Sequence, residues 1–386
     1  MKTIPYGHQY IDRHDLREIK NVIYDDYITT GKSVKKFENN IKKFTNAKYA
    51  LTCNSGTSAL YLAFKSIDIG PNDNILIPSI NFVAASNMLT TLGANIFLVD
   101  VNKNTGQITP QDIEYCIKKN NLKNIKAIIT MYLGGNPINV INFFKIKKKL
   151  KCYLIEDACH ALGSTYINNG KNYKIGSCQH SDISTFSMHP LKSITSGEGG
   201  IITTNSNKIF KRSSLQRNHG IVRSKKHYHY NIKEAGMNFR LSDINSALAI
   251  SQLKKIESFI KRRNQIRILY NHLLSKNEFL LKRNYKTEET ISACHLYQIQ
   301  VDFDKLKINR NKLMDELKKK NIITQVHYIP IYEHTLYKKL KKKFLTNTDF
   351  FYRSTISLPI FFKLKNSEIN YICKTLNSIL IKFKKN

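Results

Sequence analysis

The feature that most constrains the fold is a regular alternation of short apolar segments with longer amphipathic segments between residues 49 and 156. The apolar segments have the length of strands and lie at 49–52, 74–77, 96–99, 127–131 and 152–156. The amphipathic segments have helical spacing and lie at 57–67, 82–92, 109–120 and 140–150. Because strands joined by crossover helices run parallel, this order predicts an α/β fold around a largely parallel sheet covered on both faces. Ligands of such sheets bind at the carboxyl ends of the strands.

The segments that flank this alternation predict further elements and two domains. Asp12 can cap a helix that ends near Tyr24, with Asp15 at the capping-box position, and a second helix is expected at 33–44. Toward the C-terminus we expect a polar, histidine-rich stretch at 207–237, one long amphipathic segment at 241–274, strands at 296–301, 324–328 and 356–358, and helices at 309–320 and 366–382. The predicted domains are a large one at 1–250 and a smaller C-terminal α/β domain at 251–386.

The composition favours a soluble protein of a reducing compartment. Hydrophobic residues make up 41% of the 386 residues, but the longest apolar runs, such as 75–80, are far too short to cross a bilayer. The first residues contain no apolar stretch of signal-peptide length. The seven cysteines are scattered and never spaced as C-x-x-C, which argues against a disulfide framework and a zinc site. We therefore expect a cytoplasmic protein that binds no metal and no membrane.

The formal net charge of +34 raises the hypothesis of a nucleic-acid-binding protein. However, the densest lysine clusters, 145–149 and 338–343, have the spacing of solvated helix faces and lack interleaved aromatic residues on which bases stack. Lysines also occur in every predicted element, together with abundant Asn and Ile, which indicates a compositional trend. We infer a modest attraction for anionic ligands and expect no nucleic-acid partner.

One lysine stands in an unusual setting. Lys192 follows Pro190 and precedes the glycine-rich turn 197–200, and predicted strands at 182–186 and 201–204 enclose this loop. The strands fix the backbone, and the small residues allow another group to come close. A lysine in this position can form an imine with a carbonyl compound, most naturally pyridoxal 5′-phosphate (PLP). The alternative, a lysine on an exposed turn, stays open on this stretch alone.

Weaker signals occur upstream in the order that one cofactor needs. Residues 54–58 follow a strand and open a helix, where free N–H groups and the helix dipole can hold a phosphate, although Ser and Thr are also ordinary N-caps. Asp157 ends a strand, where a carboxylate can keep a pyridine nitrogen protonated or simply cap a helix. Phe82 can stack on a flat ring or belong to the core, and His160 can hydrogen-bond a cofactor or fill its loop. Together these signals are stronger than any one of them.

The order of these motifs resembles the DegT/DnrJ/EryC1/StrS family of sugar aminotransferases. The resemblance rests on residues 54–60, 156–163, 186–192, 197–200, 238–241, 251–255, 295–297 and 326–332. It implies a PLP-dependent transferase of fold type I (aspartate aminotransferase-like), with a mostly parallel seven-stranded sheet in the large domain. Residues 4–6, 28–32, 189–190 and 325–328 are similar to the branch of the family that acts in pseudaminic acid biosynthesis.

This resemblance implies an activity. The expected enzyme is a homodimer that transfers an amino group from L-glutamate to C4 of UDP-2-acetamido-2,6-dideoxy-β-L-arabino-hexos-4-ulose, which gives UDP-4-amino-4,6-dideoxy-N-acetyl-β-L-altrosamine. One alternative is a sister aminotransferase that acts on another UDP- or dTDP-linked 4-keto-6-deoxy sugar. A PLP-dependent sugar dehydratase is disfavoured, because such family members carry histidine where Lys192 stands. A non-catalytic nucleic-acid-binding regulator is the alternative from a different class.

The resemblance also implies roles for single residues. Lys192 would hold PLP and move the proton between substrate and cofactor, and Asp157 would pair with the pyridine nitrogen. The other expected cofactor contacts are Ser55, Gly56, Thr57, Phe82, His160, Ser187 and, across a subunit interface, Asn238. The expected sugar-nucleotide contacts are Tyr6, Asp26, Tyr27, Ile28, Thr29, Gly56, Ser187, Asn238, His327 and Tyr328. Met188 and the segment 133–135 depart from the family pattern, and we expect them to shape the sugar pocket without touching the chemistry.

Overall fold

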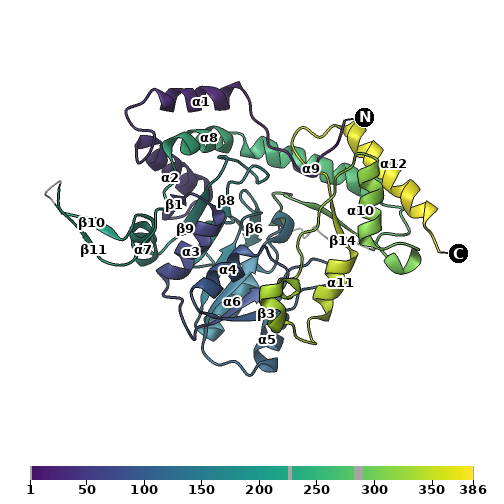
Figure 1. Cartoon of the computed structure of the whole chain (residues 1–386), viewed down its shortest axis with the longest axis horizontal. Coiled ribbons are helices and arrows are strands. Elements are labelled where there is room, and N and C mark those ends of the chain that lie inside the picture. The colour runs from purple at the N-terminus through teal and green to yellow at the C-terminus, as the bar shows by residue number, and fades with distance from the viewer. Residues whose placement is uncertain (1, 225–227, 282–289, 386) are drawn as a thin grey trace.

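The computed structural model describes residues 2–224, 228–281 and 290–385. Within these residues the central element is a seven-stranded sheet with the order β1-β9-β8-β5-β4-β2-β3 (Figure 1). Its strands are β1 (Tyr49–Cys53), β2 (Asn74–Pro78), β3 (Asn95–Val99), β4 (Ile125–Met131), β5 (Tyr153–Asp157), β8 (Ile183–Ser187) and β9 (Gly200–Thr204). Strands β3, β2, β4, β5 and β8 are parallel, whereas β9 is antiparallel to both β8 and β1. The expected mostly parallel sheet is confirmed, with each predicted strand within two residues of the observed one.

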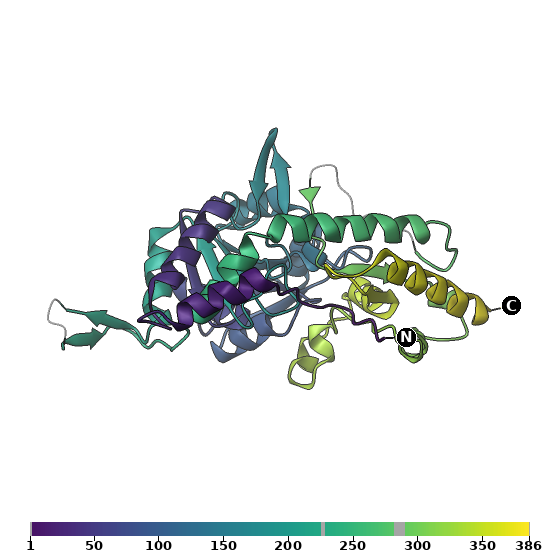
Figure 2. The same ribbon diagram turned by 90° about the horizontal axis from the view of Figure 1, so that it is seen from above.

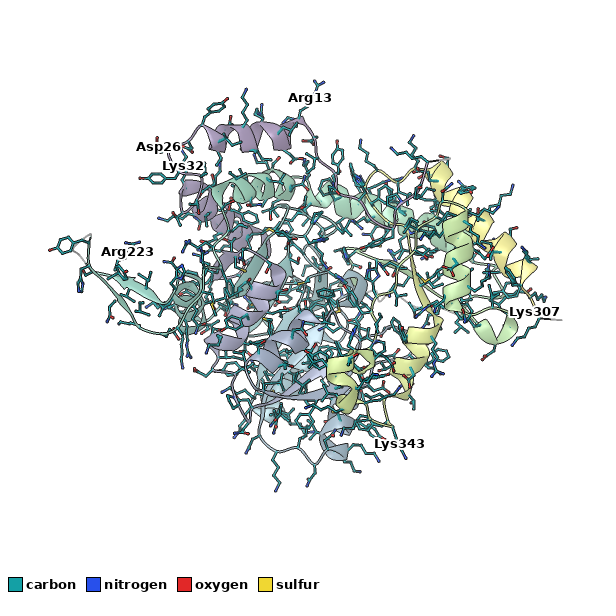
Figure 3. The ribbon with its side chains drawn as sticks, viewed as in Figure 1. Arg13, Asp26, Lys32, Arg223, Lys307 and Lys343 are labelled. Atoms are coloured by element: carbon teal, nitrogen blue, oxygen red, sulfur yellow. The ribbon has the colours of Figure 1, made fainter. Side chains whose placement is uncertain are left out.

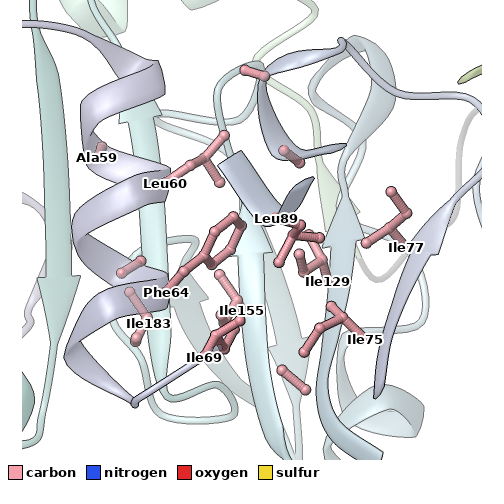
Figure 4. Packing of buried hydrophobic residues seen from close by; sticks show 14 of the residues in the cluster. Ala59, Leu60, Phe64, Ile69, Ile75, Ile77, Leu89, Ile129, Ile155 and Ile183 are labelled. Atoms are coloured by element: carbon pink, nitrogen blue, oxygen red, sulfur yellow. The ribbon is translucent and has the colours of Figure 1, made fainter. Parts of the chain in front are cut away.

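Helices cover both faces of this sheet, and successive side chains of a strand enter different layers. One layer is formed by α3 (Gly56–Ser66), α4 (Ala84–Thr91) and α7 (Asn207–Arg217). The opposite layer is formed by α2 (Lys32–Thr45), α5 (Pro110–Lys119), α6 (Val140–Leu150) and α8 (Asp243–Leu253). Ile75 and Ile77 pack with Phe64 in the first layer (Figure 4), whereas Leu76 packs in the second. Burial on both faces explains why these strands are continuous apolar runs in the sequence.

The N-terminal helix α1 (Arg13–Ile23) packs against α8, and its predicted capping box is present. The single segment expected at 241–274 is wrong, because the chain forms two helices, α8 and α9 (Ile256–Leu273). Helix α8 packs in the core of the large sheet, whereas α9 packs in a second core. At the bend, the Lys255 ammonium lies 2.9 Å from Asp12 and 2.6 Å from Asp15, which ties the break to α1.

The second core lies in the C-terminal third. Strands β13 (Tyr297–Gln300) and β14 (Thr355–Leu358) pair antiparallel, and α9, α10 (Arg310–Lys319) and α12 (Asn366–Lys382) pack on them. The strand expected at 324–328 is wrong: Gln325 forms an isolated bridge with Ser357, and the rest of the segment is irregular. The sequence also did not predict α11 (Thr346–Ser354). Because this core is separate from the cores of the large sheet, it supports our proposal of a domain boundary near residue 250.

The structure also contains shorter strands and 3₁₀ helices outside the two cores. The strands β12 (Thr290–Ile291), β6 (Thr165–Asn168) and β7 (Lys171–Lys174) form a small sheet. A hairpin of β10 (Ile221–Arg223) and β11 (Tyr230–Ile232) projects from the molecule (Figures 1 and 2). Together with α7 it occupies the stretch that was expected to be merely polar. The 3₁₀ helices are η1 (Leu133–Gly135), η2 (Phe303–Lys305), η3 (Ile331–Glu333) and η4 (Thr335–Leu340).

Two further observations concern the chain as a whole. The part of the chain that the structure describes contains no helix long and apolar enough to cross a membrane. All seven cysteines lie in that part, and each is a free thiol.

Candidate active site

A cavity of about 560 Å³ lies at the carboxyl ends of β5 and β8, where the topology predicts a ligand site. The irregular segment 325–329 and Tyr6 line its other side. Many of the predicted site residues therefore come together although they are far apart in the sequence. They are Tyr6, Ser55, Gly56, Thr57, Phe82, Asp157, His160, Ser187, Lys192, His327 and Tyr328.

Lys192 and Asp157 line this cavity together. Asp157 is the last residue of β5 and is 4% exposed, and Lys192 lies in the loop between β8 and β9. Burial lowers the pKa of Lys192, and Cys159 and Asp157 oppose this effect. Burial raises the pKa of Asp157, against the contacts of Cys159 and the charge of Lys192. An amine of lowered pKa beside a buried carboxylate is an arrangement suited to proton transfer.

Helix α3 begins at the rim of the cavity and presents groups that bind anions. Ser55 caps the helix, because its hydroxyl accepts the N–H of Ser58 at 3.1 Å. The N–H groups of Gly56 and Thr57 have no acceptor within the helix and lie at the positive end of its dipole. Gly56 also packs closely on Ser187, because an added Cβ would lie 2.8 Å from the Cβ of that serine. Helix and strand thus form a narrow cradle of the kind that holds a phosphate.

Three buried histidines, His160, His295 and His327, also line the cavity. The ring centres of His160 and His295 are 4.2 Å apart, and those of His160 and His327 are 6.4 Å apart. Burial lowers the pKa of each, that of His327 to about 3, and the charge of Lys192 lowers them further. They are therefore neutral hydrogen-bonding groups near pH 7. Among the described residues, no three His, Cys, Asp or Glu side chains are grouped so that they could hold a metal ion.

The other predicted site residues do not line the cavity of their own chain. Asp26, Tyr27, Ile28 and Thr29 lie on the exposed turn between α1 and α2, and Asn238 lies in an exposed segment after the β10–β11 hairpin. The turn and the hairpin project from the same end of the molecule, as the labels of Asp26 and Arg223 show (Figure 3). In a single subunit these residues therefore do not contribute to the site.

Among the cavity residues that sequence reasoning missed, Cys159 and Asn81 adjoin predicted ones and contact them. The Cys159 backbone N–H donates to Asp157 Oδ1 at 3.3 Å. The Asn81 Oδ1 accepts the N–H of Phe82 at 2.7 Å, and the Asn81 side chain opposes the rise in the pKa of Asp157. Cys159 directly precedes His160, and Asn81 directly precedes Phe82. Their position beside predicted site residues was therefore the signal that could have identified them.

A third omission is the contact between η1 and His160. The Gly134 N–H donates to His160 Nδ1 at 3.3 Å, and the Gly134 carbonyl accepts the N–H of His295 at 2.8 Å. The segment 133–135 therefore contacts a residue of the cavity, and its expected effect on the shape of the sugar pocket stays a prediction. Gly134 has φ of 70°, a conformation that glycine adopts without strain. His295 belongs to the motif 295–297, but nothing in the sequence indicated its contact with Gly134.

Comparison with known proteins decides what kind of protein has this site. Residues 9–377 match the profile of the DegT/DnrJ/EryC1/StrS aminotransferase family. The chain belongs to this family. A UDP-4-amino-4,6-dideoxy-N-acetyl-β-L-altrosamine transaminase of Campylobacter jejuni is 36% identical over 383 residues, which cover 99% of each protein. The predicted family, fold type and enzyme class are thereby confirmed.

Solved structures of DegT/DnrJ/EryC1/StrS proteins and related aminotransferases agree with this assignment. Helicobacter pylori PseC, an aminotransferase involved in the biosynthesis of pseudoaminic acid, has a TM-score of 0.90 at 29% identity, covering 99% of this chain and 100% of PseC. The sugar aminotransferase Spr1654 of Streptococcus pneumoniae, solved in a PLP form, has a TM-score of 0.88 at 26% identity and covers 98% of this chain and 99% of Spr1654.

Proposed function

We propose that this aminotransferase uses PLP to transfer an amino group from L-glutamate to C4 of UDP-2-acetamido-2,6-dideoxy-β-L-arabino-hexos-4-ulose. The product is UDP-4-amino-4,6-dideoxy-N-acetyl-β-L-altrosamine. The observation that carries the proposal is the Lys192–Asp157 pair in the cavity, in a chain that is 36% identical over nearly its full length to a transaminase of that name. The seven free thiols support the predicted cytoplasmic location.

The residues of the cavity fit PLP at each of its functional groups. The α3 cradle, with Gly56 against Ser187, fits the phosphate, and the buried Asp157 carboxylate fits a protonated pyridine nitrogen. The Lys192 amine fits the carbonyl group, and Phe82 lines the cavity with 53% of its surface exposed, so that its ring is available to cover a flat ligand. When bound, PLP would supply the electron sink for carbon–hydrogen bond cleavage.

The proton-transfer role falls to Lys192. An amine can accept a proton when it is neutral, and burial favours the neutral form of Lys192. Asp157 would remain ionised in the loaded site, because a positive ring nitrogen beside it offsets the cost of burying its charge. The neutral His327 and the hydroxyl of Tyr6, whose pKa burial raises, offer hydrogen bonds to the sugar without adding charge.

We further propose that the active unit is a homodimer formed by the end of the molecule that carries α1 and the hairpin. Large apolar side chains are exposed there: Leu16, Ile23, Tyr24, Tyr27, Ile28, Val222, Tyr230, Ile232 and Met237. Apolar surface gathered in this way is typical of protein–protein contacts. Among the described residues that line the cavity, Lys192 is the sole lysine and there is no arginine. Two phosphates of a nucleotide sugar need more positive charge than that, which a second subunit can supply.

An absorbance experiment tests the proposed reaction. Loaded with PLP, the protein should show an absorbance band of the bound cofactor that L-glutamate bleaches and that a suitable keto sugar restores. Restoration by the UDP-linked L-arabino 4-keto sugar alone supports the proposal. Restoration by a dTDP-linked or epimeric sugar instead would support the aminotransferase activity and contradict the proposed substrate.

Lys192→Ala should lose turnover completely while its circular dichroism spectrum stays unchanged. Normal turnover in this variant would contradict the role of the lysine.

A further inference from the structure

Both ring nitrogens of His160 are already engaged by the protein. The Gly134 N–H lies 3.3 Å from Nδ1, and the Tyr328 hydroxyl oxygen lies 2.9 Å from Nε2. His160 is 1% exposed, so its ring has little freedom to turn away from these partners. The direct hydrogen bond from His160 to a cofactor that the sequence suggests stays a prediction, and it would have to replace or share one of these two contacts.

These two contacts fix the position of the proton on the ring. A backbone N–H can only donate, so Nδ1 must be the acceptor of the Gly134 bond. A neutral imidazole that accepts at Nδ1 carries its proton on Nε2, and that proton is donated to the Tyr328 oxygen. The ring stays neutral because burial and the charge of Lys192 lower its pKa well below the usual range.

The same logic fixes the direction of the Tyr328 hydroxyl. Its oxygen accepts from His160, so its own proton has to point to another acceptor. Burial raises the pKa of Tyr328, and Asp157 and Cys159 raise it further, so the phenol keeps that proton. Tyr328 lines the cavity, and its ring centre is 5.7 Å from that of Phe82.

We propose that Tyr328 donates a hydrogen bond to an oxygen atom of the ligand in this cavity, and that His160 is the positioning residue that aims this donor. Gly134 fixes the tautomer of His160, and the His295 ring, tilted by 35° with its centre 4.2 Å away, packs against the imidazole. The chain of donors runs from the Gly134 amide through the imidazole and the phenol to the ligand. The identity of the ligand rests on the proposed function, but the tautomer and the direction of the donors do not.

The tautomer can be measured on the protein without any ligand. In ¹⁵N NMR spectra of histidine-labelled protein, the signals lost in His160→Gln identify His160. We expect a neutral ring protonated at Nε2, and the same ring form in Tyr328→Phe, because Gly134 still occupies Nδ1. A ring protonated at Nδ1 would overturn the proposal, because Tyr328 would then donate to His160. This result stands even if PLP does not bind.

The donor itself is tested in the PLP-loaded enzyme. Tyr328→Phe should lower kcat at least tenfold with a smaller change in KM, or shift the pH titration of the absorbance band, depending on whether the acceptor oxygen belongs to the sugar or to the cofactor. Tyr332→Phe is the matched control, because the Tyr332 hydroxyl donates to Asp349 at 2.6 Å and does not line the cavity. A Tyr328→Phe enzyme with unchanged kcat and an unchanged titration would refute the donor role.

A double-mutant cycle separates positioning from mere packing. If His160 acts through Tyr328, His160→Leu should cause a loss similar to that of Tyr328→Phe, and the double variant should lose little more. His160→Gln retains an N–H donor and should recover part of the activity that His160→Leu loses. Independent, additive losses, with no rescue by glutamine, would show that His160 has a purely structural role.

Discussion

At the scale of single residues, the proposed reaction depends on the buried carboxylate of Asp157. Asp157→Asn preserves size and shape but removes the negative charge that would hold a proton on the pyridine nitrogen. We expect the variant to bind PLP and to have a kcat about 10²–10⁴-fold lower, because the electron sink weakens. Single-turnover absorbance kinetics with L-glutamate measure the loss. Asp112→Asn is a suitable control, because burial also raises the pKa of that carboxyl, which belongs to the α5 capping box far from the cavity.

The buried histidines make the stability of the ligand-free protein sensitive to acid. The pKa of His327 is lowered to about 3 in the fold, against 6.5 for an unperturbed histidine. Between these values the unfolded chain binds a proton that the native protein does not, so the free energy of unfolding decreases as the pH falls through this window. His327 alone contributes about 1.4 kcal/mol per pH unit well below pH 6.5, and His160 and His295 act in the same direction.

Urea unfolding at pH 7, 6 and 5 measures this effect. The slope of unfolding free energy against pH should be shallower for His327→Gln than for the wild type. Equal slopes for the wild type and the His327 variant would contradict the lowered pKa.

The sequence predicted those cavity residues whose chemistry and whose position in the chain both pointed to a site. Asp157 ends a strand, Lys192 and the start of α3 follow the carboxyl ends of strands, and parallel strands bring these ends to one edge. The position of His295 against His160 depends instead on how the second core docks on the large sheet, over 135 residues of separation. Contacts of this kind depend on packing between domains, for which no periodicity or local motif exists.

At the scale of secondary-structure elements, one carboxylate caps a helix to which it does not belong. Helix α2 begins at Lys32, and its N-cap residue, Gly31, has no side chain that could cap it. Asp243, at the start of α8, accepts the N–H groups of Gly31 and Ser33 at 2.7 Å each and that of Val34 at 3.2 Å. The negative charge also lies at the positive end of the α2 dipole. This long-range cap holds the turn 25–31, which carries four of the predicted substrate contacts.

Removal of this cap should loosen the start of α2. Asp243→Ala leaves three N–H groups without their acceptor, and we expect a loss of about 2 kcal/mol in unfolding free energy. Urea unfolding measures it, with Asp304→Ala, in the short helix η2 on the second core, as a control that should change little. A loss below about 0.5 kcal/mol would show that water replaces the carboxylate. Increased proteolytic cleavage near residue 27 should accompany the loss.

Helices and strands could be predicted where the hydrophobic periodicity is strong. Their type and bounds were ambiguous where the two domains meet. The strands of the parallel sheet were placed within two residues because burial on both faces gives unbroken apolar runs. The break between α8 and α9 was missed, since neither Pro nor Gly marks it and the bend is held by the ion pairs of Lys255 with α1. The segment 324–328 has the composition of a strand, but most of it lines the cavity instead of pairing with a neighbour.

At the scale of the whole molecule, the distribution of charge and apolar surface argues for two subunits. The chain carries a formal net charge of +34, yet Lys192 is the sole lysine or arginine among the described residues that line the cavity. Many of the exposed large apolar side chains lie on α1, the turn that follows it and the hairpin, next to Asn238, although others, such as Ile268 and Ile381, lie elsewhere. A second copy that covers this surface would remove it from water and bring Asn238 and further positive charge toward the neighbouring cavity.

Mixed dimers provide the decisive test of shared sites. Lys192→Ala and Asn238→Asp should each be inactive as pure proteins, the second because it places a negative charge where a phosphate is expected. If Asn238 acts across the interface, a dimer of one chain of each kind has one intact site, built from the Lys192 of one chain and the Asn238 of the other. Random mixing, after unfolding and refolding together, should then restore about a quarter of wild-type activity, since half of the dimers are mixed and each has one intact site of two.

Lys192→Ala mixed with Asp157→Asn is the matched control. Both residues belong to the same cavity, so no mixed dimer regains an intact site. Failure of the first mixture to recover activity would place Asn238 in its own subunit's chemistry or outside the site altogether.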